Sequence, residues 1–191
     1  MDARIAIMAD LSGPKMRIGT VTPEPKELKA GDNFVLTTDQ AADGAERVSV
    51  SFPGLTQAVK PGNTLFLNDG YIQLKVTGVQ GNDVACTVLV GGEIRSRKGL
   101  NLPGIDLGIS AFTERDRECL KFALENGVDA VSQSFVERSA DIEAVRKAAE
   151  DLGYHPFIIA KIERSGALEH IEEILGAADG IMVARGDLGV E

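Results

Sequence analysis

The apolar residues of the C-terminal half form two alternating kinds of pattern. Short continuous apolar runs over Asp129–Phe135, Phe157–Glu163 and Gly180–Ala184 are typical of buried β-strands. Between these runs, apolar residues recur every three or four positions, as in a helix: Ile142, Val145, Ala149 and Leu152, then Leu168, Ile171 and Leu175. Strand, helix, strand in this order predicts parallel strands joined by helical crossovers, and we take a barrel as the parent architecture.

Cap signals delimit the predicted helices. Ser139 is predicted to cap the helix that Gly153 ends. An earlier helix over Thr113–Glu125 has Thr113 and Asp116 at capping-box spacing, with Gly127 as its stop. Near the N-terminus, Arg4–Met8 is predicted to be a further barrel strand.

Residues 18–98 have a different character. Four prolines interrupt them, and two short runs, Arg47–Phe52 and Thr64–Leu67, have β-type composition. Gly81 and Asn82 suit a tight hairpin turn. The predicted fold class is therefore α/β, a partial TIM-type (β/α) barrel with an inserted small all-β barrel domain. Residues 1–17 and 99–191 are assigned to the barrel domain and 18–98 to the insertion.

Composition excludes several classes of function. The 191 residues are 43% hydrophobic and 26% charged, which is typical of a globular chain. A formal net charge of -9 argues against nucleic acid and against a membrane surface as partners, because both are polyanionic. Cys86 and Cys119 have no metal-binding spacing and are expected to be reduced structural thiols. No signal peptide or transmembrane run is apparent, so the expected location is the cytoplasm.

Charged residues gather at two consecutive strand ends. Lys161 and Glu163 lie two residues apart, on one face of the chain, where a strand ends, and Asp187 follows the next strand in a glycine-flanked turn. An isolated Lys-x-Glu in a strand is more often a buried ion pair. Three charges beside glycines, which let a ligand approach the backbone, instead predict a metal and anion site.

The same residues carry a resemblance to a known family. Ala160–Glu163, Asp179–Glu191, Asp10–Arg17, Asn68–Gly70 and Lys98–Gly104 resemble blocks of the pyruvate kinase family, in the family's order and across nearly the whole chain. The Met182–Glu191 part is highly specific. Alone, Gly13–Pro14 and Asn68–Gly70 are weak signals.

The resemblance implies a reaction and a set of roles. It implies Mg²⁺-dependent phosphoryl transfer from phosphoenolpyruvate to ADP, giving pyruvate and ATP, in glycolysis. Glu163 and Asp187 match the family's metal ligands for Mg²⁺, with Mn²⁺ as a possible substitute. Lys161 matches the catalytic residue, whose fixed charge stabilises the moving phosphoryl group. Lys161, Gly186 and Asp187 match the substrate-binding positions.

Residues at the two borders of the insertion match nucleotide contacts. Arg17 and Lys98 are implied to bind ADP or ATP when the inserted domain closes as a lid. Asp69, in the Asn68–Gly70 turn, is the weakest candidate for facing the site, because an Asp-Gly turn is usually only a turn.

The region around Asp10, which matches the family's monovalent-cation site, departs from the common pattern. Leu11 stands where many members have threonine, Ser12 where they have lysine, and Lys15 where they have glutamate. The Lys15 ammonium can supply the charge that K⁺ otherwise provides, so the resemblance implies that K⁺ is not required.

Other parts of the family's catalytic chain find no match. The upstream arginine, asparagine, serine and histidine cluster and the later barrel strands are missing, so we expect half of the catalytic barrel plus the β lid. We expect this chain alone to be inactive or impaired, and the full-length parent to be a homotetramer. Two alternatives remain open: a non-catalytic fragment that keeps only metal or nucleotide binding, and a metal-dependent aldolase or lyase on the same barrel.

Overall fold

The chain divides into two compact units. The computed structural model describes residues 5–41, 44, 46–105 and 107–190. One unit, here the α/β unit, comprises Met1–Pro14 and Ile109–Gly189, and the other, the β unit, comprises Lys15–Gly108 and Val190–Glu191. The domain limits expected from the sequence stay predictions.

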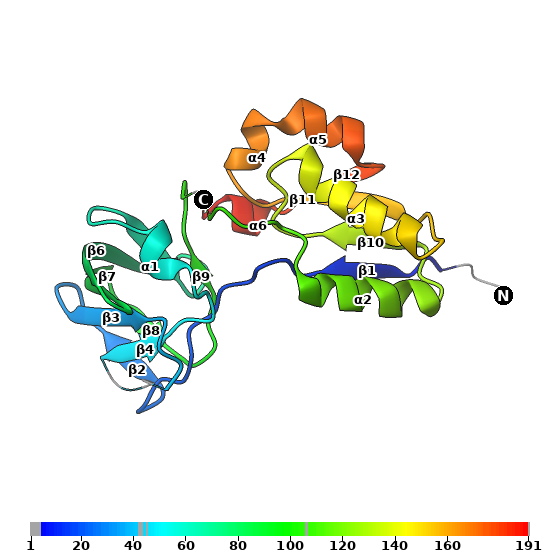
Figure 1. The fold of residues 1–191 in the computed structure, drawn as a ribbon. Helices are drawn as coiled ribbons and strands as arrows, with labels where there is room; N and C mark the ends of the chain where they lie inside the picture. Colours follow the sequence, from blue (N-terminus) through cyan, green and yellow to red (C-terminus); the bar gives the residue numbers. More distant parts are fainter. Residues whose placement is uncertain (1–4, 42–43, 45, 106, 191) are drawn as a thin grey trace. The chain divides into compact units, whose positions relative to one another are not determined.

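A parallel sheet is the centre of the α/β unit (Figure 1). Its four strands lie in the order β1 (Met8–Leu11), β10 (Ala130–Gln133), β11 (Phe157–Ile162) and β12 (Gly180–Val183), and each pairs in parallel with its neighbour. All four carboxyl ends therefore lie at one edge of the sheet. This arrangement confirms the predicted α/β class and is consistent with part of a (β/α) barrel.

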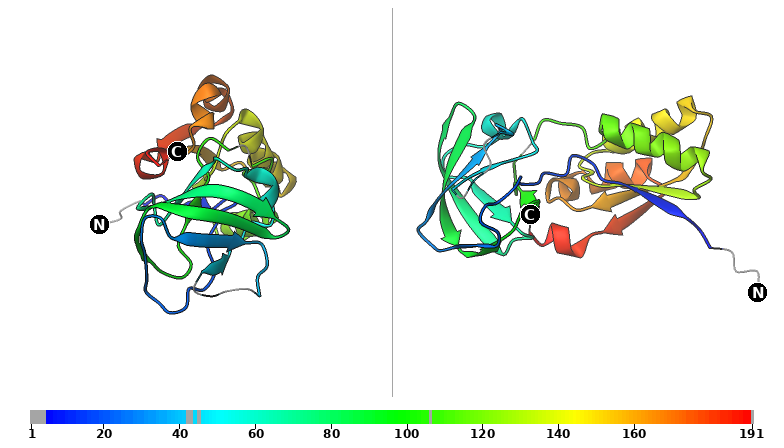
Figure 2. Two further views of the ribbon diagram at one scale, coloured as in Figure 1. Left: turned by 90° about the vertical axis from the view of Figure 1, so that its left-hand side faces the viewer. Right: turned by 90° about the horizontal axis from the view of Figure 1, so that it is seen from below.

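Helices connect these strands and cover their apolar side chains. They are α2 (Glu114–Glu125), α3 (Ser139–Asp151), α4 (Gly166–Glu169) and α5 (Ile171–Ala177). The short α6 (Arg185–Leu188) follows β12 and has no buried residue. Helices α2 and α3 lie along one face of the sheet (Figures 1 and 2). The core between sheet and helices includes Leu120, Leu124, Val131, Ile142, Val145, Ile158, Ala160 and Ile174. Burying this apolar surface is the main force that holds strands and helices together.

The start of α2 is as the sequence predicts. The Thr113 hydroxyl accepts a hydrogen bond from the Asp116 backbone N–H at 3.1 Å, and the Asp116 carboxylate accepts one from the Thr113 N–H at 2.9 Å. Gly127 follows with a φ of +76°, in the left-handed region where glycine ends helices without strain. The cap of α3 differs from the prediction. Its N-cap is Arg138, and the Asp141 carboxylate accepts the backbone N–H groups of Glu137 and Arg138.

Two predicted helix faces are wrong in part. Leu168 and Leu175 are 53% and 51% exposed, and Ala167 and Ile174 are buried in their place. The reason is a break at His170, which separates α4 from α5. The three- and four-residue spacing of the apolar residues therefore does not define one face of a single helix across this segment. Leu152 is also exposed, because α3 ends one residue before it.

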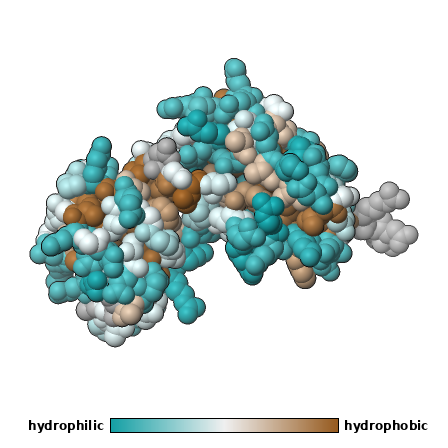
Figure 3. Space-filling view, in the orientation of Figure 1, coloured by the Kyte–Doolittle hydropathy of each residue, from teal (hydrophilic) through white to brown (hydrophobic). Residues whose placement is uncertain are grey.

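The first strand begins later than predicted. The sheet partner of β1 begins at Ala130, which pairs with Met8, so the strand runs from Met8 to Leu11 and not over Arg4–Met8. Arg4 lies outside the described residues. Ile7 is exposed before this strand, as are Ile181 and Val183 in the other edge strand, β12. Figure 3 shows apolar residues reaching the surface among hydrophilic ones in both units.

Antiparallel strands make up most of the β unit. A six-stranded sheet has the order β4 (Arg47–Ser49), β3 (Asn33–Thr37), β7 (Asp83–Val90), β6 (Ile72–Gln80), β5 (Thr64–Leu67) and β9 (Leu100–Asn101). A second sheet pairs β2 (Lys26–Leu28) with β8 (Gly92–Ile94), and α1 (Leu55–Ala58) is a single helical turn. Gly81, at a φ of +59°, makes the predicted hairpin turn between β6 and β7. The predicted all-β insertion is confirmed as a fold.

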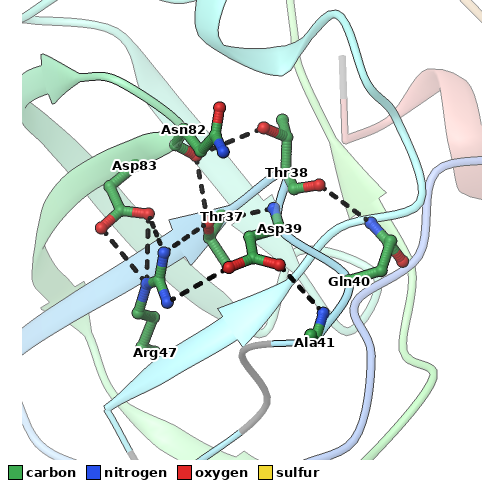
Figure 4. A network of polar contacts seen from close by, with 8 residues as sticks. All are labelled: Thr37, Thr38, Asp39, Gln40, Ala41, Arg47, Asn82 and Asp83. Atoms are coloured by element: carbon green, nitrogen blue, oxygen red, sulfur yellow. Dashed lines mark hydrogen bonds and ion pairs between the residues drawn. The ribbon is translucent and has the colours of Figure 1, made fainter.

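Arg47 ties three strands of the β unit together (Figure 4). Its guanidinium donates to both carboxylate oxygens of Asp83 on β7 and to the Thr37 hydroxyl at the end of β3. The hydrogen bond from Arg47 is the largest cause that lowers the pKa of Asp83. Asp39 lies within 3.8 Å of the same guanidinium.

The two cysteines are unpaired, as expected. Cys86 is buried in β7, and burial raises its pKa to about 12, which keeps the thiol protonated at neutral pH. Cys119 is half-buried in α2. Within the described ranges, the structure contains no helix with the length and apolar character needed to cross a membrane.

Candidate active site at the carboxyl ends of the parallel strands

Polar side chains gather where β1, β10 and β11 end. Lys161 is the second-last residue of β11, and Glu163 follows that strand directly. Asp10 lies in β1 opposite Ser132 of β10, and Ser134 follows β10. Because the strands are parallel and in register, their ends converge, as in other folds that bind ligands at this edge.

Lys161 is the centre of this group. Its ammonium lies 2.8 Å from Glu163 Oε1, 2.8 Å from Ser134 Oγ and 3.3 Å from Asp10 Oδ1. The Lys161 side chain is only 13% exposed. The ammonium therefore has two carboxylates and one hydroxyl as acceptors, a set that holds it in one orientation.

The surroundings of Lys161 favour its charged form. Burial lowers the pKa of Lys161, but the hydrogen bond and charge of Glu163, together with the charge of Asp10, outweigh it and raise the pKa above its ordinary value. The side chain thus keeps a fixed positive charge at neutral pH. Such a charge stabilises developing negative charge on a bound group.

Glu163 is more deeply buried than Lys161. The residue is 5% exposed, and its second oxygen, Oε2, accepts a hydrogen bond from the Phe135 backbone N–H at 3.0 Å. Burying a carboxylate is costly unless it is paired and hydrogen-bonded, and Glu163 is both. The buried ion pair weighed as an alternative is thus present in the structure.

The residues of the predicted monovalent-cation region are divided between the two units. Asp10 Oδ1 accepts the Ser132 hydroxyl at 2.7 Å, so the Asp10 carboxylate joins the Lys161 group. The Leu11 side chain is buried in the core, and its carbonyl accepts the Ser134 N–H at 2.9 Å. Lys15 belongs to the β unit and is exposed.

Gly186 and Asp187 lie in α6, which follows β12, and both are exposed. Among the described residues, the Asp187 side chain forms no ion pair with Lys161, so the expected gathering of all three charges is not seen as direct contact. A side chain at Gly186 would meet no other atom within 4 Å. The protein itself therefore leaves open space beside this residue.

The carboxylates suit a hard cation. Glu163 and Asp187 follow neighbouring strands, since Ile162 pairs with Val183, and both offer oxygen donors. In the part of the chain that the structure describes, no three residues of the His, Cys, Asp and Glu types gather into a ready-made metal cluster. An ion held by two carboxylates takes its remaining ligands from water or substrate, which is the usual situation of Mg²⁺.

The β unit brings other predicted residues together. Arg17 forms a β-bridge with Gly99, and the Ile18 N–H donates to the Lys98 carbonyl at 3.0 Å. Arg17 and Lys98, 81 positions apart in sequence, are thus neighbours across two antiparallel segments. An added Cβ at Gly99 would lie 3.9 Å from Asp69 Oδ1, so Asp69 lies near the same segment.

Ser132, Ser134 and Phe135 contact the site but are not predicted from the sequence. Ser132 and Ser134 flank Gln133 at the end of an apolar strand. Polar residues at the carboxyl end of a strand are a sequence signal by which both serines could have been assigned to the site. The contribution of Phe135 is a backbone N–H, which leaves no trace in residue type.

Comparisons with known proteins agree with one another. The family model "Pyruvate kinase, barrel domain" matches residues 1–191. Three curated relatives that bear the name pyruvate kinase are similar to this chain. The one from Thermococcus litoralis is 46% identical over 191 residues, the one from Thermotoga maritima 42% over 187, and the one from Corynebacterium glutamicum 41% over 187. These matches cover 98–100% of this chain and 39–40% of each relative, so the chain spans about two fifths of their length.

Proposed function

The chain belongs to the pyruvate kinase family, and we propose on this basis that it contributes to transfer of a phosphoryl group from phosphoenolpyruvate to ADP. The observation that carries the proposal is the Lys161 ammonium, held by two carboxylates and a hydroxyl at the carboxyl ends of parallel strands. The reaction moves a highly charged group, and a fixed cation there stabilises the transition state.

Each residue has a part in this proposal. Mg²⁺, with Mn²⁺ as a substitute, would neutralise phosphoryl oxygens when bound, and Glu163 and Asp187 would hold it. Lys161 remains protonated throughout and acts by its charge, without transferring a proton. The backbone N–H groups of Gly186 and Asp187 bind the substrate carboxylate, and the exposure of α6 leaves them accessible.

The nucleotide is assigned to the β unit. Arg17 and Lys98 would bind the phosphates of ADP or ATP, and their position on adjacent segments supports a common ligand. Asp69 remains the weakest candidate near them. A cytoplasmic location, a homotetrameric whole enzyme and the absence of nucleic-acid and membrane partners stay predictions.

A coupled assay of pyruvate formation tests the proposal. It compares two proteins: this chain, and a chimaera in which this sequence replaces the matching residues of the Thermococcus litoralis relative. Pyruvate formation by the chimaera supports the proposed reaction. If the folded chimaera binds Mn²⁺ and nucleotide but forms no pyruvate, the non-catalytic alternative is correct. Cleavage of an aldol substrate without nucleotide would favour the lyase alternative.

We predict that Gly186→Ala in the chimaera separates stability from substrate binding. The protein leaves room for the methyl group, and alanine is favoured over glycine inside a helical turn by about 0.5–1 kcal/mol, so the free energy of unfolding should not fall. The KM for phosphoenolpyruvate should rise at least about 10-fold, because the methyl group meets the bound carboxylate. Steady-state kinetics and thermal unfolding check both parts. An unchanged KM would remove Gly186 from the substrate site.

We also expect the chimaera to work in K⁺-free buffer, with Lys15 as the reason. Lys15→Glu replaces the ammonium by a carboxylate, which restores the residue that many family members have at this position. The new carboxylate then needs a cation such as K⁺ to balance its charge. Activity of that variant should depend on K⁺, by about 10-fold or more between K⁺-free and K⁺-containing buffer, since K⁺ would then supply the positive charge that Lys15 no longer provides. Equal loss of activity from both proteins without K⁺ would contradict this assignment.

A further inference from the structure

The turn after β10 has an uncommon backbone. Phe135 has a φ of +63°, in the left-handed region that residues with side chains rarely adopt. Ser134, immediately before it, is fully buried at 0% exposure. Non-glycine residues remain in such a conformation only where their surroundings hold them, and they cluster at functional sites. The proposed roles so far use neither residue.

Both residues of this turn contact the charged pair. The Ser134 hydroxyl accepts a hydrogen bond from Lys161 Nζ at 2.8 Å, and the Phe135 N–H donates to Glu163 Oε2 at 3.0 Å. One oxygen of Glu163 thus faces Lys161 and the other faces the turn. Two consecutive residues of one turn therefore hold the cation and the anion of the site.

Neighbouring segments hold the turn from several sides. The Ser134 N–H donates to the Leu11 carbonyl at 2.9 Å, and Gln133 Nε2 donates to the Ser134 carbonyl at 2.9 Å. Gly13 packs closely beneath it: an added Cβ would lie 3.0 Å from the Ser134 carbonyl oxygen and 3.2 Å from Phe135 Cδ2. Gly13 also has a φ of +63°. Glycine is therefore favoured there both by the backbone conformation and by the lack of room for a Cβ.

From these contacts we infer that Ser134 and Phe135 are positioning residues, which fix the orientation of the Lys161 ammonium and the Glu163 carboxylate toward the reacting phosphoryl group. The inference rests on the proposed function. A turn with a merely structural role would contribute to folding but would not affect the charged pair. Misplacement of a preorganised charge weakens transition-state binding far more than substrate binding.

Ser134→Ala in the chimaera tests the hydroxyl. We expect kcat to fall about 10–100-fold, as is typical for supporting partners of a site, while the KM for phosphoenolpyruvate changes by less than about threefold. The pKa of Lys161, followed by NMR of ¹³C-labelled lysine, should fall because the ammonium loses an acceptor. Ser134→Thr keeps the hydroxyl and should restore kcat and the pKa. Ser139→Ala, which removes a hydroxyl at the first residue of α3, is the matched control.

A second pair of variants tests the backbone of Phe135. Phe135→Gly adopts positive φ readily and keeps the N–H, so Mn²⁺ affinity, measured by electron paramagnetic resonance, should stay within about threefold. Phe135→Val places a β-branched residue at positive φ, which is strongly disfavoured, and should weaken Mn²⁺ binding at least about 10-fold. This comparison needs no turnover.

The outcomes separate the two proposals. If kcat, the pKa of Lys161 and Mn²⁺ affinity stay unchanged in folded Ser134→Ala and Phe135→Val, the positioning role is overturned, and the proposed reaction is unaffected. If the unmodified chimaera forms no pyruvate, the proposed reaction fails, and the lysine titration and Mn²⁺ binding still decide the role of the turn.

Discussion

Lys161→Met in the chimaera should lower kcat by about 10³-fold or more, with a smaller change in the KM for phosphoenolpyruvate. Methionine has nearly the same length but no charge, so the variant removes the ammonium that three acceptors hold in the site. Removing a charge that acts mainly in the transition state typically has an effect of this size. Stopped-flow or coupled measurement of pyruvate formation gives the rates.

The same change also leaves Glu163 buried without its partner. Breaking a buried ion pair from one side typically destabilises a protein by about 3–5 kcal/mol, and the 13% exposure of Lys161 favours the lower part of that range. Thermal unfolding must therefore show that the variant is folded at the assay temperature. Lys147→Met is the matched control, because Lys147 is exposed and pairs with Asp151 on the surface of α3. A kcat within about threefold of the unmodified value would exclude Lys161 from catalysis.

Glu163→Gln should abolish most of the Mg²⁺ or Mn²⁺ affinity, by about 100-fold or more, and with it the activity. The substitution keeps the shape of the side chain but removes one of only two carboxylates assigned to the metal, and hard cations depend on ligand charge. Titration with Mn²⁺ followed by electron paramagnetic resonance measures the loss directly. Glu137→Gln breaks a different ion pair, with buried Arg164, and should leave Mn²⁺ affinity unchanged. Unchanged affinity in Glu163→Gln would remove this residue from the metal site.

A pH dependence follows from the same pair. The folded-state pKa of Lys161 is raised above its ordinary value of 10.5, so the stability that it contributes is fully present below that value and is lost as the pH rises through the folded-state pKa. In Glu163→Gln the negative charge of Glu163, which helps to raise the pKa of Lys161, is absent, while burial still lowers that pKa. The difference in unfolding free energy between the two proteins should therefore shrink as the pH rises above 10.5.

Much of the fold is predictable from local patterns. The runs at Phe157–Glu163 and Gly180–Ala184 predict strands because burial on both faces requires continuous apolar residues. The Thr113 and Asp116 pair predicts the start of α2 because capping is a contact between near neighbours in sequence. Among the predictions that fail, those at Leu168, Leu175 and the first strand depend on where a helix breaks or where a strand partner begins.

The candidate site, too, is predictable from the sequence only in part. The sequence by itself determines the family, the α/β class with its β insertion, and the residue types that carry charge at the strand ends: Lys161, Glu163 and Asp187. Only the tertiary structure decides that Lys161 lies between Asp10 and Glu163, and that Ser134 and the Phe135 N–H complete the group. The physical reason is register. Strands far apart in sequence become neighbours through sheet pairing, and a backbone N–H at positive φ is positioned by packing against Gly13, not by its own residue type.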